Sequence, residues 1–182
     1  LSTVLGIALS LPLGLLAARN LTPLWVNAPV RGVIAVCRSL HYVIVAILFV
    51  KAIGFGALAG VAALTVASMG FVAKLFAEAV EEISMKQVEA IRATGAGPLK
   101  VLVYGVLPQV ASRFVGFSLY QLDSNLRNST LVGIVGAGGI GGTLFAALKR
   151  FDYDFVAAIL LSIIALIFMA EVISGRIRAA MR

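Results

Sequence analysis

Long apolar segments alternate with shorter polar ones along the chain, and most of the apolar segments are as long as a membrane-spanning helix. Crossing about 30 Å of hydrocarbon takes roughly 20 apolar residues. The pattern predicts five spans, at Leu1–Ala18, Arg31–Val50, Ala57–Ala73, Leu107–Asn128 and Phe155–Ile173. We therefore expect an all-α membrane protein in which residues 1–182 form a single transmembrane domain.

Three features refine this helix pattern. Small residues such as Gly60, Ser68 and Gly70 crowd the third span, so we expect it to be buried among other helices. The segment Leu21–Val30 contains two prolines and a tryptophan and is predicted to be an interfacial loop. The chain begins inside an apolar run without Met, so we expect that a segment precedes Leu1.

The polar stretch Phe76–Pro108 separates the third and fourth spans. Ser84 and Gln87 have the spacing of a capping box, which predicts a helix start near Met85. The helix is predicted to end at Thr94-Gly95, because glycine accepts the left-handed conformation that closes many helices. Met85, Val88 and Ile91 form one apolar stripe. Such a helix either lies on the membrane surface as a linker or docks into a groove of a partner protein.

Composition supports a lipid environment. Of 182 residues, 61% are hydrophobic and 13% charged, whereas soluble domains are about 25% charged. The net charge of +7 is typical of basic cytoplasmic loops, and no basic run with stacking aromatics indicates nucleic-acid binding. Cys37 and His41 are each the only residue of their type, so the sequence predicts neither an intrachain disulfide nor a metal site.

Lysine and arginine residues near the ends of the spans fall into two groups. One side receives Arg19, Arg31, Lys74, Lys86, Arg92, Lys100, Arg176, Arg178 and Arg182. The opposite side receives Lys51, Lys149 and Arg150. Because cytoplasmic loops carry the excess of basic residues, the first side and the polar helix are predicted to be cytoplasmic.

A polar cluster occurs late in the fourth span and contains Asp123, Asn125, Arg127 and Asn128. If the helix continues through it, Asp123 and Arg127 lie one turn apart and can pair. Charges inside a bilayer usually face a cavity or pathway, and Arg127 would then be suited to an anionic substrate. The alternative is that the helix has ended and these residues form a wet loop.

The segment Val132–Gly142 is rich in glycine and fits the dinucleotide-binding pattern G-x-G-x-x-G. That fold needs repeated βαβ units, which are incompatible with lipid-spanning flanks. We predict instead a broken or re-entrant segment near Gly133–Leu148, with close backbone packing or a gate. The glycines expected to do this are Gly133, Gly136, Gly138, Gly139 and Gly141.

The polar stretch resembles the EAA loop of ABC-importer permeases. That pattern is E-A-A, three residues, G, nine residues, I, one residue and L-P. The matching residues are Glu89, Ala90, Gly95, Leu107 and Pro108, while Ile91 replaces the second Ala and Gly105 replaces the Ile. The resemblance implies that this helix couples the permease to a cytoplasmic ATPase, through Ser84, Gln87, Glu89, Ala90, Gly95, Leu107 and Pro108.

Most of the chain resembles the phosphonate-type subfamily of these permeases. The similarity includes Asp123, Asn125, Arg127, Ser129 and Thr130, which the resemblance implies line the translocation pathway. It implies a type I permease bundle like that of methionine importers, in a bacterial cytoplasmic membrane. It also implies three kinds of partner: an ABC ATPase dimer, an external substrate-binding protein and a second permease copy.

The chain has no G-x-x-x-x-G-K-[ST] phosphate loop, so ATP and Mg²⁺ are expected on the partner ATPase and the chain itself is not expected to be an enzyme. The expected cargo is a phosphonate or a related phosphorus oxyanion. Three alternatives remain open: a permease for methionine or another small solute, a gated channel, and an intramembrane enzyme.

Overall fold

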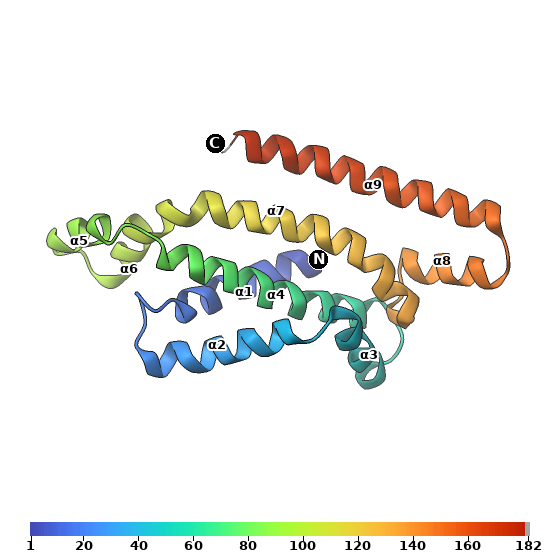
Figure 1. Cartoon of the computed structure of the whole chain (residues 1–182), viewed down its shortest axis with the longest axis horizontal. Helices are drawn as coiled ribbons and strands as arrows, with labels where there is room; N and C mark the ends of the chain where they lie inside the picture. The colour runs from blue at the N-terminus through green and yellow to red at the C-terminus, as the bar shows by residue number, and fades with distance from the viewer. Residues whose placement is uncertain (181–182) are drawn as a thin grey trace.

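A computed structural model describes residues 1–180, and this part of the chain is helical with no strand (Figure 1). The helices, in chain order, are α1 (Ser2–Ala17), α2 (Leu24–Ser39), α3 (Tyr42–Ile53), α4 (Ala57–Glu81), α5 (Met85–Ala93), α6 (Pro98–Val101), the π turn η1 (Leu102–Val106), α7 (Leu107–Val132), the π turn η2 (Gly133–Ala137), α8 (Ile140–Lys149) and α9 (Tyr153–Ala180). The predicted all-α class is confirmed.

The helix α4 lies at the centre of the bundle and packs against α1, α2, α3 and α7. Small residues make these contacts close. A methyl group at Gly6 of α1 would lie 2.5 Å from the Cβ of Ser68, and one at Gly70 would lie 2.8 Å from the Cβ of Cys37 on α2. Lipid gives helices no hydrophobic reason to associate, so such close van der Waals contact is a main source of attraction. The predicted burial of this span is confirmed.

Three of the described helical runs are long and apolar enough to cross a membrane: α4, the 40-residue run Pro98–Ala137, and α9. The helices α2 and α3 pass the same test only as a pair bent by 92°. The first predicted span corresponds to α1, a shorter apolar helix of 16 residues that rises about 24 Å. Four of the five predicted spans thus meet the criterion within residues 1–180, one of them as a bent pair.

The second predicted span, Arg31–Val50, is wrong as a single helix. The structure ends α2 at Ser39, leaves Leu40 and His41 extended, and begins α3 at Tyr42. The ring nitrogen Nδ1 of His41 accepts a hydrogen bond from the Val43 amide at 3.4 Å and so caps the new helix. The polar residues Arg38, Ser39 and His41 lie at this bend, but the apolar residues on both sides led to the prediction of one continuous span.

The predicted interfacial loop Leu21–Val30 is also wrong for most of its length, since α2 already begins at Leu24. Pro23 is extended and provides the N-terminal boundary. The buried Asn27 side chain donates a hydrogen bond to the Thr22 carbonyl at 3.3 Å, which closes the chain onto the first turn. Trp25 remains 90% exposed, as a residue at a lipid interface would be.

The fourth predicted span continues further than expected. The helix α7 extends to Val132 rather than Asn128, and it passes through the polar cluster without a break. The wet-loop alternative for this cluster is therefore excluded. The helical run also begins earlier, at Pro98, because α6 and η1 join α7 continuously.

A break near Gly133–Leu148 is present as predicted. Val135 and Gly136 leave the helical conformation, Gly138 and Gly139 have positive φ values, and α8 then begins at Ile140. The ends of α7 and α8 approach so closely that a methyl group on Gly141 would overlap the carbonyl oxygen of Thr130. Side chains other than hydrogen are excluded at Gly133 and Gly141, which supports close packing at these two positions, whereas a methyl group at Gly139 would meet no atom within 4 Å.

The two predicted groups of basic residues lie at opposite ends of the bundle. The end of α1, the end of α4, α5 and α6 are at one end in Figure 1, whereas α8 and the end of α3 are at the other. The C-terminal part of α9 returns toward the first end. Arg182, which is predicted to belong to the same group, lies outside the described residues.

A buried polar network joins the three central helices. The Asn125 side-chain amide on α7 donates to the hydroxyl of Ser68 on α4 at 2.7 Å and to that of Thr3 on α1 at 3.0 Å. Gln121 donates to the same Ser68 hydroxyl at 3.1 Å and to the Asn125 carbonyl at 3.0 Å. All four side chains are buried. Asn125 is held between helices, and its predicted role in lining the pathway stays a prediction.

We expect Asn125→Ala to lower the free energy of unfolding by about 1–2 kcal/mol, because it removes hydrogen bonds from α7 to both α1 and α4. Thermal unfolding of the purified protein in detergent would measure this loss. Asn128→Ala is the matched control, since within residues 1–180 the Asn128 amide bonds only Ser124 on its own helix, at 3.2 Å. Equal melting temperatures for the two variants would contradict the structural role of Asn125.

Candidate functional site

The short helices α5 and α6 project from the end of the bundle that carries most of the basic residues (Figure 1). The apolar stripe of α5 faces its own chain. Val88 is completely buried, and Met85 and Ile91 pack against a cluster formed by Ala18, Phe76, Ala79, Val80, Val88, Val101, Val106 and Val110. The linker interpretation, in which this stripe would rest on lipid, does not fit this packing.

The opposite face of α5 is open. Lys86, Gln87, Glu89 and Ala90 are exposed, and the Glu89 carboxylate makes no ion pair with any residue in the range 1–180. The helix is therefore fixed to the bundle by one face and presents the other, which carries the E-A pair, away from the bundle. This geometry suits a helix that contacts another protein.

Ser84 is the N-cap residue as predicted, but the capping box with Gln87 is not formed. The Ser84 side chain makes no capping hydrogen bond. Gln109, from the first turn of α7, replaces Gln87 as the side chain that bonds the Ser84 amide. Its Oε1 accepts from the Ser84 amide at 2.9 Å, and its Nε2 donates to the Gly105 carbonyl at 2.6 Å. The start of α5 is thereby tied to α7 rather than to its own first turn.

The predicted end of α5 at Thr94-Gly95 is confirmed. The Thr94 hydroxyl donates to the Ile91 carbonyl at 2.7 Å, and Gly95 has a φ of +78°. An L-residue with a side chain is strained in this left-handed region. A methyl group added at Gly95 would meet no atom within 4 Å, so the constraint on this position is conformational rather than steric.

Gly105 and Ile91, the two departures from the E-A-A…I-x-L-P pattern, lie against each other. A methyl group at Gly105 would lie 3.4 Å from the Cδ1 of Ile91 and 3.5 Å from the Cα of Val88. The pattern has Ala at the position of Ile91 and Ile at the position of Gly105, so the small and the large residue are exchanged in this chain. The two differences therefore compensate in volume across one contact between α5 and η1.

Leu107-Pro108 begins α7 directly after the π turn η1. Pro108 has no amide hydrogen to donate to Tyr104, which interrupts the regular ladder of the helix. The Leu107 amide donates to the Leu102 carbonyl, five residues earlier, so the chain passes this point with one wide turn. Leu107 packs against the same apolar cluster as α5.

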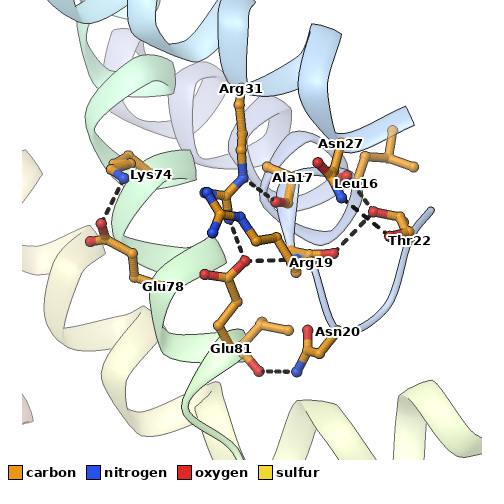
Figure 2. A network of polar contacts seen from close by, with 12 residues as sticks. Leu16, Ala17, Arg19, Asn20, Thr22, Asn27, Arg31, Lys74, Glu78 and Glu81 are labelled. Carbon is orange, nitrogen blue, oxygen red and sulfur yellow. Dashed lines mark hydrogen bonds and ion pairs between the residues drawn. The ribbon is translucent and has the colours of Figure 1, made fainter. Parts of the chain in front are cut away.

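A network of polar contacts lies directly behind this projection, and no pattern in the sequence indicates it (Figure 2). The Glu81 carboxylate at the end of α4 accepts hydrogen bonds from the Arg31 guanidinium of α2 and, at 2.7 Å, from the Arg19 backbone amide. Arg31 also donates to the Ala17 carbonyl at 2.8 Å, and Asn20 donates to the Val80 carbonyl at 2.7 Å. The ends of α1, α2 and α4 are thus joined beside α5.

The predicted pairing of Asp123 with Arg127 is present: the Arg127 guanidinium donates to one carboxylate oxygen of Asp123. The Arg127 side chain is 55% exposed, whereas that of Asp123 is 17% exposed. Ser129 donates to the Leu126 carbonyl of its own helix at 2.7 Å, and the Thr130 hydroxyl is buried without a partner among residues 1–180. The pathway role of these residues stays a prediction.

Between residues 1 and 180, no three His, Cys, Asp or Glu side chains come together in a way that could hold a metal ion.

We expect Gly105→Ile to displace α5, since the added side chain meets Val88 and Ile91, and to lower the free energy of unfolding by about 1–3 kcal/mol. Combining it with Ile91→Ala should recover most of the loss. Thermal melts of the two single variants and the double variant form the required cycle. Additive losses would show that the two positions do not compensate.

Comparison with known proteins agrees with this geometry. The family described as binding-protein-dependent transport system inner membrane component matches residues 10–182. The phosphate-import permease protein PhnE of Mycolicibacterium smegmatis is 46% identical over 182 residues, which is 98% of this chain and 34% of that protein. The phosphite transport system permease protein PtxC of Stutzerimonas stutzeri is 44% identical over 97% of this chain and 64% of its own length.

The fold has a solved counterpart. A structure of the MetNI methionine ABC transporter in an inward-facing conformation superposes with a TM-score of 0.85 and 25% identity, covering all of this chain and 89% of the matched chain. The predicted type I ABC-importer permease fold is confirmed. The chain belongs to the family of binding-protein-dependent transport system inner membrane components.

Proposed function

We propose that this chain is the permease subunit of an ATP-driven importer that carries phosphonate or a related phosphorus oxyanion. The observation that supports this most directly is the α5 projection. It is a short helix whose apolar face is buried in its own bundle and whose Glu89 face is open to a partner. Two cytoplasmic ATPase subunits would bind α5 in two copies of the chain, and an external binding protein would deliver the substrate.

The choice of substrate is supported by the relatives. The two that are 44% and 46% identical over nearly the whole chain have names that refer to phosphite and phosphate. The methionine transporter shares the fold at 25% identity. Because the chain spans 34% and 64% of the first two relatives, the substrate assignment concerns the transport domain that they share with it.

The contacts around α5 explain how movement of an ATPase would reach the membrane. Val88 is seated among residues of α4, α6 and α7, and Gln109 ties the start of α5 to α7. The Glu81 network joins the neighbouring ends of α1, α2 and α4. A displacement of α5 would therefore move these helices together as a rigid body, which is how such proteins alternate access between the two sides.

The proposed cargo can be tested by uptake into proteoliposomes that contain the complete transporter with its ATPase and binding protein. We expect ATP-dependent uptake of phosphite or methylphosphonate and no uptake of methionine. Conduction of ions without ATP would support a gated channel instead. Methionine uptake without phosphorus uptake would place the chain with the other importers of its fold.

Coupling can be tested at the end of α5. We expect Gly95→Val to lower the transport achieved per ATP hydrolysed by about fivefold to thirtyfold, because the positive φ costs a branched residue roughly 1–2 kcal/mol and the helix end must shift. The measurement is the ratio of uptake to ATP hydrolysis in the same proteoliposomes.

Gly97→Val is the matched control. Gly97 lies in the same loop with nothing within 4 Å, but its φ of −67° is accessible to any residue. We expect it to keep the wild-type ratio. If both variants lower the ratio equally, bulk in the loop rather than the conformation of Gly95 determines coupling.

A further inference from the structure

An open groove of about 330 Å³ with several polar side chains lies at the bend between α2 and α3, and no residue of α5 lines it. One wall is formed by the end of α2 and the bend, and the other by α4 and α7. The side chains that matter for its chemistry are Arg38, His41, Tyr120, Gln121, Ser124 and Asn128. Neither Asp123 nor Arg127 lines it.

Arg38 provides the charge of this groove. No ion pair or hydrogen bond of its guanidinium occurs among residues 1–180, and it is exposed. It lies seven residues beyond Arg31 on α2, which places it about 10 Å further along the helix axis from the Glu81 network. A charged side chain in the hydrocarbon region is unfavourable against lipid and usually faces a cavity or a water-filled pathway.

The position of Arg38 is built into the packing of the bundle. Gly70, near the middle of α4, lets α2 approach closely: a methyl group there would lie 3.2 Å from the Cγ of Arg38. Behind the groove, Gln121 belongs to the buried network with Ser68 and Asn125. The wall opposite Arg38 is therefore rigid, and it presents Ser124 and Asn128, whose side chains are bonded at 3.2 Å.

Arg38 also lines a second groove, of about 470 Å³, that leads toward the α5 end between α1, α2 and α4. The other cations there are already neutralised, since Lys74 pairs with Glu78 at 2.7 Å and Arg31 pairs with Glu81. Arg38 is thus the residue that the two grooves share. Of the arginines and lysines that line them, Arg38 is the one without a carboxylate partner within residues 1–180.

We propose that Arg38 is the side chain that receives the phosphorus oxyanion in transit, with Ser124 and Asn128 as the polar wall of the same site. The planar guanidinium fork matches the oxygens of a phosphonate, phosphite or phosphate group. Arg127, selected from the sequence, is less suited because its charge is already matched by Asp123. This inference rests on the proposed function and adds the residue that makes the pathway selective for anions.

The test uses the complete transporter in proteoliposomes, with phosphite, methylphosphonate and inorganic phosphate as probes. We expect Arg38→Gln to lower the maximal uptake rate about tenfold to a hundredfold, since a hydrogen bond to a charged group is lost in transit. Arg38→Lys, which keeps the charge, should recover part of the rate. ATP hydrolysis without substrate should be unchanged in both variants, because the groove is remote from α5.

Lys51→Gln is the control for removal of a positive charge. Lys51 is exposed near the end of α3 and lines neither groove, so wild-type uptake is expected. If wild-type transporter moves none of the three probes, the proposed function fails. If it moves them and Arg38→Gln moves them equally fast, the proposed function stands and the role of Arg38 is overturned.

Thiol labelling gives a second measurement if Arg38→Gln does not assemble. In a Cys37→Ser background, Ser124→Cys should react several-fold faster with an anionic than with a cationic methanethiosulfonate reagent, because Arg38 attracts anions. Excess phosphite should slow the reaction. Ser162→Cys, exposed on the apolar helix α9, is the control for a lipid-facing thiol. Ser124→Cys reacting as slowly as this control would show that the groove is not a wet pathway, and would overturn the proposal.

Discussion

Close contact between helices at small residues is the constraint on which the rest of this structure depends. Apolar side chains gain nothing by leaving lipid for another apolar surface, so the bundle is held by contact distance and by a few internal hydrogen bonds. Gly6 lets α1 lie against α4 beside Ser68, and Asn125 of α7 can then bond both Ser68 and Thr3 of α1. Packing and polar bonding support each other here, because the network forms only when the backbones are this close.

The same close packing explains how a displacement at the α5 projection can reach the glycine break at the opposite end of the bundle. The helical run Pro98–Ala137 extends from the α5 projection to the glycine break and passes the buried network on its way. Gln109 ties it to the start of α5, and Gly133 and Gly141 join its other end to α8. A helix bonded along its length to its neighbours transmits displacement, whereas loosely packed helices would absorb it.

Local features were predictable from the sequence and distant ones were not. The end of α5 at Gly95 and the glycine break follow from conformational preferences of the residues themselves. The bend before Tyr42 was not predicted, because Arg38, Ser39 and His41 beside it are interpreted from the sequence as polar residues inside one span. Gln109 accepts a hydrogen bond from the amide of Ser84, the N-cap residue 25 positions earlier, and no spacing rule relates such positions. The capping box failed for this reason: a tertiary partner replaced the local one.

The two arginines considered for substrate binding also differ in whether local sequence or tertiary packing identifies them. Sequence spacing identified Arg127 because a carboxylate stands one turn away, but that neighbour is what neutralises it. Arg38 has no such neighbour in the sequence, and its importance appears only when α2 is seen against α4 and α7. A fixed cation attracts a passing anion most strongly when its charge is not already matched and when little water screens it. Arg38, which has no carboxylate partner within residues 1–180, meets the first of these conditions, and the Asp123–Arg127 ion pair does not.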